Sequence, residues 1–448
     1  MAEVLKFSKQ SADAPPSNRP ELDIGPENPS APRQNHTLTR RIFSRSTALP
    51  ATLFGLASLT CLLAFLVNVP ILQIAVLGYF LDSSARIARG GNLWTGFIGV
   101  KTAAKIGRWV LCTLLILIPL RFVGGLWANA QIVDATSQQT AGLSALYSAL
   151  AIVTTLHILS ALSCGGEFRH FFWPFVVPFS ILIRGCKRLI SFCRGVSGRP
   201  KNAERSAAVR LPSKAQKGWF VPKIVWQKLR QRTLYTQSRD DTLAFMQKLQ
   251  LPHFFWLGTK GFIGSAIWLL LPTVLLTNAN HPRAGFAGLS IALGVLTAVP
   301  IFMILPMLQI QFAVDRRFGS LFDVRSAWAR MRRAPLACLL ALLLLLVLAL
   351  PLFLLKIEKI PSELFWLLSV LFVVLGWPAR FAWGGVYRYA QSRERRAART
   401  IRWPIGIFAA ALALIFAFLF FLTRYISWNG TLSLFENHVF LLPAPFWF

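Results

Sequence analysis

Long apolar runs separated by shorter polar segments dominate the chain. A helix needs about 20 apolar residues to cross the hydrocarbon core of a bilayer. A shorter run at 170–183 contains two prolines, so we expect a re-entrant or interfacial helix there. The pattern predicts an all-α fold, a polytopic transmembrane helical bundle with eight or nine membrane segments. The candidate spans are 48–81, 109–128, 141–163, 254–277, 285–314, 335–355, 362–383 and 403–423.

The first run, 48–81, is too long for one straight span. Its 34 residues would make a helix about 50 Å long, against a hydrocarbon core of about 30 Å. Pro70 removes a backbone donor and bends any helix that contains it. Two alternatives fit: a hinged pair of legs broken at 68–70, or one long kinked helix with the N-terminal tail outside. Three arginines at 40–45 favour the pair, which keeps them in the cytoplasm.

One phrase occurs twice in the apolar pattern. "VPILQI" at 69–74 and "LPMLQI" at 305–310 each lie late in a long run and lead into a basic segment. This recurrence favours a weak internal duplication with parallel copies, and coincidence in apolar sequence is the alternative. Because an amide in hydrocarbon needs a partner, we expect Gln73 and Gln309 to point into the bundle at matching depth, each hydrogen-bonded.

Composition and charge set the orientation. Hydrophobic residues make up 55% of the chain, mean hydropathy is +0.53, and the formal net charge is +31. A soluble protein this basic would suggest nucleic acid. Here the basic groups are concentrated in loops, where positive-inside logic places them beside anionic lipid headgroups in the cytoplasm. We therefore expect membrane lipids as partners and no nucleic acid. The basic segments are 82–108, 184–253, 315–334, 384–402 and the short link around Arg169.

The pattern divides the chain into five parts. In the third, "WFVPKIVWQKLRQR" at 219–232 places its apolar residues at i, i+3, i+4 spacing, which predicts an amphipathic helix on the inner leaflet; a solvated coil is the alternative. The parts are a disordered polar tail (1–47), a first membrane half (48–183), a basic cytoplasmic loop (184–253), a second membrane half (254–423) and an aromatic-rich extracytoplasmic C-terminal segment (424–448).

Few side chains offer chemistry inside the spans. His157 lies in the middle of an apolar run, so it joins Gln73 and Gln309 as a candidate intramembrane polar residue, although a hydrogen-bonded structural histidine is the alternative. "SCGGEFRHFFWP" at 163–174 contains Cys, Glu and His, but no second cluster completes a metal site. The candidate headgroup-binding residues are Arg86, Arg89, Arg169, Lys223, Lys228, Arg230 and Arg232.

Catalytic motifs are absent from the sequence. It contains no nucleotide-binding glycine loop, nucleophile elbow or zinc-protease motif, and no paired intramembrane carboxylates. We expect a protein that is not an enzyme, with no catalytic residue, no cofactor and no metal.

Several short motifs carry a resemblance. Gly78-Tyr79 followed by Arg86, Arg89 and Gly90-Gly91 forms one motif, and the others are "FRHFFWP" (168–174), "LPLFLLKIE" (350–358), "WPARFAWGG" (377–385) and "HVFLLPAPF" (438–446). Together they resemble a family of uncharacterised bacterial multi-pass membrane proteins of unknown function, planctomycete-like in character. The likeness spans most of the chain after residue 45. It implies an integral protein of the bacterial cytoplasmic (inner) membrane, and no activity.

Two functions fit these patterns. The first is a non-enzymatic membrane protein that organises lipids or partner proteins through its basic cytoplasmic face. The second is a transporter or channel with a pathway between two related halves. A polar, water-accessible cavity lined by Gln73, Gln309 and His157 would indicate the second, and a dry, close-packed interior the first.

Overall fold

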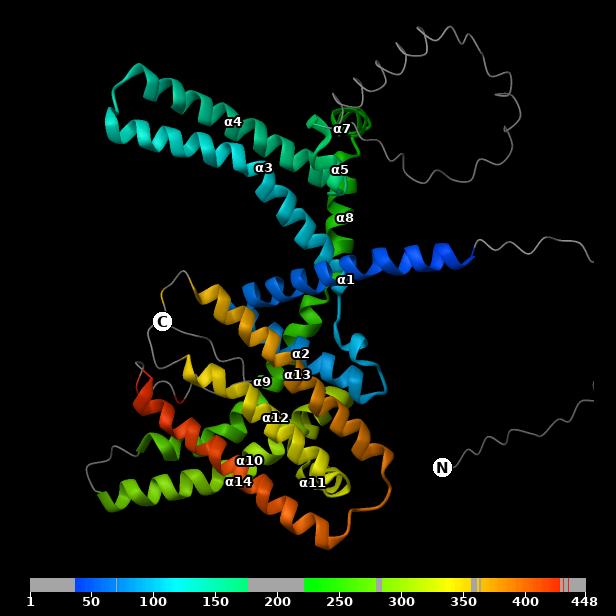
Figure 1. Cartoon of the computed structure of the whole chain (residues 1–448), viewed down its shortest axis with the longest axis vertical. Coiled ribbons are helices and arrows are strands. Elements are labelled where there is room, and N and C mark those ends of the chain that lie inside the picture. Colours follow the sequence, from blue (N-terminus) through cyan, green and yellow to red (C-terminus); the bar gives the residue numbers. More distant parts are fainter. Residues whose placement is uncertain are drawn as a thin grey trace, which may run out of the picture. The chain divides into compact units, whose positions relative to one another are not determined.

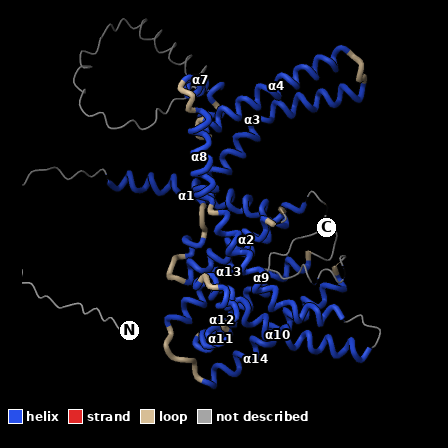
Figure 2. Tube along the Cα trace, turned by 180° about the vertical axis from the view of Figure 1, so that it is seen from behind, coloured by secondary structure: helices blue, strands red, loops and turns tan. Residues whose placement is uncertain are grey.

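The computed structural model describes residues 37–69, 71–175, 221–278, 284–355, 361, 364–427, 430 and 434. These residues form helices and turns, with no strand among them (Figures 1 and 2). Eight of the described helical stretches are long and apolar enough to cross a membrane. The predicted all-α polytopic bundle is therefore confirmed, and the chain is a multi-pass membrane protein.

The described helices coincide with the predicted apolar runs, and most of them extend beyond those runs. The chain divides into a unit of residues 1–49 and a unit of residues 50–448, and all contacts below lie within the second. In chain order the helices are α1 (Thr37–Asn68), α2 (Leu72–Ala88), η1 (Leu93–Gly96), α3 (Val100–Val133), α4 (Gln138–Ser163), α5 (Phe168–Phe171), α7 (Val221–Arg230), α8 (Leu234–Leu249), α9 (Leu251–Thr277), α10 (Ala284–Asp315), η3 (Phe318–Phe322), α11 (Val324–Arg333), α12 (Pro335–Leu354), α13 (Phe365–Ser392) and α14 (Arg399–Ile426).

The long first run is broken into two helices. α1 ends at Asn68 and α2 begins at Leu72, so the hinged pair of legs is confirmed and the single kinked helix is wrong. Ile71 turns the chain with a φ of 71°, a conformation that β-branched residues rarely adopt. The Asn68 side-chain amide lies at this turn and connects it to α13. It donates to Ala64 O at 3.0 Å and accepts from the Ser369 hydroxyl of α13 at 2.8 Å.

α2 and α10 run in the same direction and end together. Arg89, just after α2, donates to the carbonyls of Ala313 and Val314 in the last turn of α10, at 3.1 and 2.8 Å. These contacts satisfy carbonyls that a helix C-terminus leaves without partners. The expectation that the two copies of the repeated phrase run parallel is therefore confirmed, and the expectation that both lead to the cytoplasm stays a prediction.

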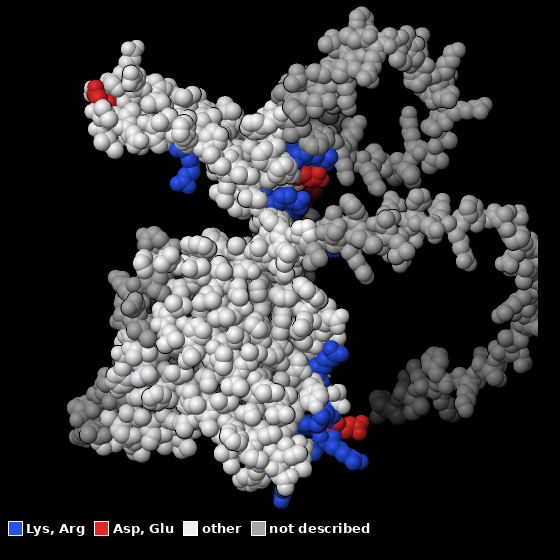
Figure 3. Space-filling view, in the orientation of Figure 1, with Lys and Arg blue, Asp and Glu red and all other residues white. Residues whose placement is uncertain are grey.

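Basic segments far apart in sequence meet at this end of the bundle, which we call the basic end. His253 at the start of α9 lies 3.9 Å from the Asp82 carboxylate of α2. The link after α13 joins α11 through a hydrogen bond from Ala397 N to Arg332 O at 3.1 Å. Lys and Arg side chains gather along one edge of the bundle, where α13 and α14 connect (Figure 3). Segments 82–108, 315–334 and 384–402 thus share one end, as positive-inside logic requires.

Some predicted segments fall partly or wholly outside the described residues. Of the run 170–183, the structure describes residues 170–175, in which α5 ends and one further turn follows. The disordered tail was expected over residues 1–47, but residues 37–47 are helical and form the first part of α1, so that part of the expectation is wrong. Residues 1–36, residues 184–220 of the basic loop and most of the C-terminal segment also lie outside. Those expectations remain predictions.

Candidate functional site

Gln309 forms a deeply buried polar contact between helices of the bundle. Its side chain is fully buried, its amide nitrogen donates to the Ser265 hydroxyl of α9 at 2.7 Å, and its amide oxygen accepts from the guanidinium of Arg380 on α13. Arg380 is itself 5% exposed. The glutamine therefore joins three helices, as the need of a buried amide for partners predicts.

Gln73 does not repeat this arrangement. It is half-buried, and its side chain makes no hydrogen bond within the described part of the chain. The two glutamines also lie at different heights relative to α9. Gly261 of α9 faces Leu81, which comes eight residues after Gln73, and it faces Phe312, which comes only three residues after Gln309. The prediction of two equivalent, hydrogen-bonded glutamines is therefore wrong, and the shared phrase marks no equivalent depth.

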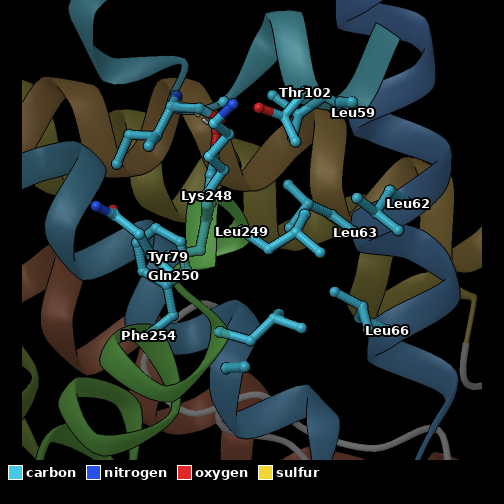
Figure 4. A pocket seen from close by; sticks show the side chains of 15 residues that line it. Leu59, Leu62, Leu63, Leu66, Tyr79, Thr102, Lys248, Leu249, Gln250 and Phe254 are labelled. Atoms are coloured by element: carbon cyan, nitrogen blue, oxygen red, sulfur yellow. Dashed lines mark hydrogen bonds between the residues drawn. The ribbon is translucent and has the colours of Figure 1, made fainter. Parts of the chain in front are cut away.

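His157 serves a local structural contact. Its Nε2 lies 2.7 Å from the backbone oxygen of Phe171, which fixes the end of α4 against α5. The three predicted polar residues are not brought together, and no cavity described here is lined by Gln73 or Gln309. A small apolar cavity of about 60 Å³ beside Tyr79 and Phe254 has room for a water but not for an organic substrate (Figure 4).

Arg86 and Arg89 are anchored at the basic end. Asp82 is buried, and its carboxylate lies 3.1 Å from Arg86 and 3.4 Å from Arg316. This network holds α2, α9 and α10 together, with His253 as a further neighbour. Arg86 and Arg316 remain about half-exposed, with 41% and 53% of their side chains accessible, so each can still face an anion outside the bundle.

The segment after α4 is a structural cap. Arg169 pairs with Glu167 at 2.6 Å, and His170 Nδ1 accepts a hydrogen bond from the Glu167 backbone N–H. Burial, helped by the charge of Arg169, lowers the pKa of His170, and burial raises the pKa of the nearby Cys164 thiol. The histidine is therefore neutral and the thiol protonated at pH 7. Among the described residues no group of three potential metal ligands occurs.

The predicted amphipathic helix is present as α7. Lys228 reaches across to donate to Ser163 O at the end of α4, at 3.0 Å. Lys223, Arg230 and Arg232 are exposed, and in the described structure no hydrogen bond or ion pair holds them. Their binding to headgroups, like that of Arg86, Arg89 and Arg169, stays a prediction.

A second group of arginines was not singled out from the sequence. Arg330 of α11 donates to the Gln311 side chain at 2.7 Å and stacks over Tyr387 of α13, which fixes α11 against the bundle. The link after α13 is then tied to α11 by the Ala397–Arg332 bond. Five arginines surround the place where α11 meets this link, and all are at least partly exposed. We call them the arginine patch: Arg332, Arg333, Arg395, Arg396 and Arg399.

Sequence reasoning also missed Arg380. A charged residue inside the run 362–383 was the available signal, since charge is expensive in hydrocarbon and marks a buried contact. The density of arginine in 315–334 and 384–402 was visible, but nothing in the pattern indicated that the two segments touch.

Comparison with known proteins gives one match. The family described as "Protein of unknown function (DUF4013)" matches residues 247–357, from the end of α8 to just beyond α12. No curated protein and no solved structure matches the chain. The match fits an uncharacterised family and gives no support to a planctomycete origin. Residues 247–357 are thus similar to a DUF4013 domain, a domain of unknown function, and this region includes Gln309 and the helices α9, α10 and α11.

Proposed function

We propose that this protein is a non-enzymatic protein of the bacterial cytoplasmic membrane that binds anionic lipid headgroups at its basic end and thereby organises lipids or partner proteins. The observation that supports this proposal is the arginine patch. Its side chains come from two segments some 60 residues apart in sequence, held together by the Ala397–Arg332 bond.

The position of the patch suits headgroup binding. It lies beside the first turn of α14 and the end of α11, and α12 and α14 leave this junction as apolar helices. Each Lys or Arg close to an anionic membrane surface contributes about 1 kcal/mol of attraction. Five such groups on one junction would therefore bind anionic headgroups strongly, and they outnumber the exposed carboxylate of Glu394 in the same link.

The orientation belongs to the same proposal. Cytoplasmic loops carry the excess of Lys and Arg, and the cytoplasmic leaflet carries the anionic lipids. With the basic end in the cytoplasm, the patch, Arg86 and Arg89 face that leaflet together. The transporter alternative receives no comparable support, because Gln309 is fully buried and shares no described cavity with His157.

The experiment compares two five-fold variants of the purified full-length protein. Arg332, Arg333, Arg395, Arg396 and Arg399 are replaced by Gln in one and by Lys in the other. Bound lipid is identified by mass spectrometry after reconstitution with phosphatidylglycerol and phosphatidylethanolamine. We expect the Gln variant to lose at least about tenfold of its preference for phosphatidylglycerol, and the Lys variant to keep most of it. An unchanged preference in a folded Gln variant would overturn the proposal.

A further inference from the structure

An apolar groove runs between α7 and the α3–α4 hairpin. Its volume is about 810 Å³, within the range of sites that take small molecules. It is open along one side, and its walls are aliphatic and aromatic. The residues that form it include Leu115 and Pro119 of α3, Val153 and His157 of α4, and Trp173 and Trp226 beside and on α7.

Three polar side chains of the groove already have partners within the protein. The Thr154 hydroxyl donates to Leu150 O at 2.7 Å, the Ser160 hydroxyl donates to His157 O at 2.8 Å, and the His157 ring contacts Phe171 O. The exposed indole N–H of Trp226 still offers one donor, but most of the wall is aliphatic or aromatic. An apolar occupant gains most by entering, because it loses no hydrogen bonds to water.

The length of the groove matches one leaflet of a bilayer. Along α4 it extends from Ser160, near the helix end, to Leu150. Ten helical residues span about 15 Å, which is half of a hydrocarbon core of about 30 Å. An occupant that enters at the end of α4 would thus reach roughly the middle of the membrane.

The mouth of the groove is basic. α7 covers this end with the face formed by Pro222, Val225, Trp226 and Leu229. α7 also carries Lys223 and Arg230, next to this apolar face. Both side chains are exposed, and in the described structure neither has a hydrogen-bond or ion-pair partner. Lys228 is fixed to Ser163 O and adds positive charge at the same place. An anionic group at the mouth would meet these charges directly.

We propose that this groove binds one anionic phospholipid, with an acyl chain along α4 and the phosphate at Lys223 and Arg230. The inference deepens the proposed lipid binding, but it uses a different set of residues from the arginine patch. Apolar walls, a length of one leaflet and a cationic mouth together match the three parts of such a lipid.

The test uses the full-length protein in nanodiscs that contain a phospholipid with a photoreactive diazirine in its acyl chain. Crosslinked peptides are mapped by mass spectrometry with a phosphatidylglycerol probe and, separately, a phosphatidylcholine probe. We expect crosslinks at groove residues such as Val153 and Trp226, stronger by about tenfold with the anionic probe. Val153→Trp fills the groove and should remove them. Leu159→Trp, on an exposed part of α4 outside the groove, is the matched control and should leave them unchanged.

A second variant tests the mouth. Lys223→Gln with Arg230→Gln should abolish the preference for phosphatidylglycerol while crosslinking in the groove persists. Crosslinks spread evenly over the exposed faces of α3 and α4, or equal labelling by both probes, would overturn the inference. Those results would leave the arginine patch untouched, since its five-fold variants report on other residues. Loss of lipid preference at the patch alone would likewise leave the groove standing.

Discussion

Gln309 connects three helices through one amide. Its partners, Ser265 and Arg380, lie on α9 and α13, while Gln309 itself lies on α10. In a bilayer the apolar side chains of these helices gain little by leaving lipid for each other, so polar contacts and close packing determine which helices associate. A single buried amide with two partners therefore contributes strongly to the specificity of this bundle.

Replacing each glutamine of the repeated phrase should affect the free energy of unfolding differently. Gln309→Leu removes one partner from each of two buried groups, and we expect it to lower the free energy of unfolding by about 1–3 kcal/mol. Gln73→Leu is the matched control, because the Gln73 side chain makes no hydrogen bond among the described residues, and a change within about 0.5 kcal/mol is expected. Unfolding of both purified variants in detergent measures the difference. Equal losses would contradict the account.

Asp82 supplies the buried negative charge of the basic end. Asp82→Asn keeps the shape but removes the charge that faces Arg86 and Arg316. Because these arginines are 41% and 53% exposed, solvent screening reduces the effect, and we expect a loss of about 1–2 kcal/mol. Asp240→Asn is the control, since the Asp240–Arg239 pair is largely exposed and contributes little. A neutral or stabilising Asp82→Asn would show that the network is not structural.

At the scale of elements, α2 and α9 cross with their backbones in contact. A side-chain carbon at Gly78 would overlap the carbonyl oxygen of Phe254, and one at Gly258 would overlap the carbonyl oxygen of Ile74. Small residues at a crossing let two membrane helices approach this closely. The sequence shows both glycines, but only the structure shows that they face each other.

Either glycine should therefore resist substitution. Gly78→Ala or Gly258→Ala would force the backbones of α2 and α9 apart, and we expect a loss of about 3 kcal/mol or more. Gly385→Ala provides the contrast, because Gly385 lies in α13 with no atom within 4 Å of an added carbon, and the alanine should stabilise the helix slightly. Thermal unfolding of the three variants measures the effect. A neutral Gly78→Ala would contradict the close crossing.

The cap of α11 should make stability depend on pH. Asp323 accepts a hydrogen bond from Ser326 N at 3.1 Å, and its bonds with Ser326 lower the pKa of the carboxyl. A lowered folded pKa stabilises the protein above the unfolded value, about 3.9, and this contribution is lost as pH falls through the folded pKa. We expect Asp323→Ala to lower the melting temperature at pH 6, with a smaller difference from the unaltered protein at pH 3. A difference that does not change with pH would refute the titration.

The sequence predicted most elements but not their full extent. Every candidate span is helical in its described residues, and the first forms two helices, α1 and α2, as the proline in its sequence predicted. However, α3 begins at Val100 rather than 109. The polar helix α8, which the apolar pattern does not mark, leads directly into α9. Hydrophobicity records only the part of a helix within hydrocarbon. The contact of Arg380 with Gln309 and the groove under α7 depend on tertiary packing, which no local pattern contains.

At the scale of the whole molecule, the contacts define a threading. Ser58 of α1 faces Gly107 near the start of α3, whereas Asn68 meets Ser369 at the start of α13, so the apolar part of α1 leads away from the basic end and α2 returns to it. The eight membrane-capable stretches and the shorter helix α2, threaded as a further crossing, make nine crossings: α1, α2, α3, α4, α9, α10, α12, α13 and α14. We infer that the apolar part of α1, which starts at Pro50, begins on the same side of the membrane as the basic end, and that this side is the cytoplasm.

Cysteine accessibility tests this threading most directly. In a background without the six native cysteines, single cysteines replace Gly319 and Ser392 at the basic end, and Ala135 and Pro361 in the links expected on the opposite side. Intact spheroplasts are treated with a membrane-impermeant maleimide before and after lysis. The account predicts labelling of Ala135→Cys and Pro361→Cys in intact spheroplasts, and of Gly319→Cys and Ser392→Cys only after lysis. Labelling of Gly319→Cys or Ser392→Cys in intact spheroplasts would contradict it.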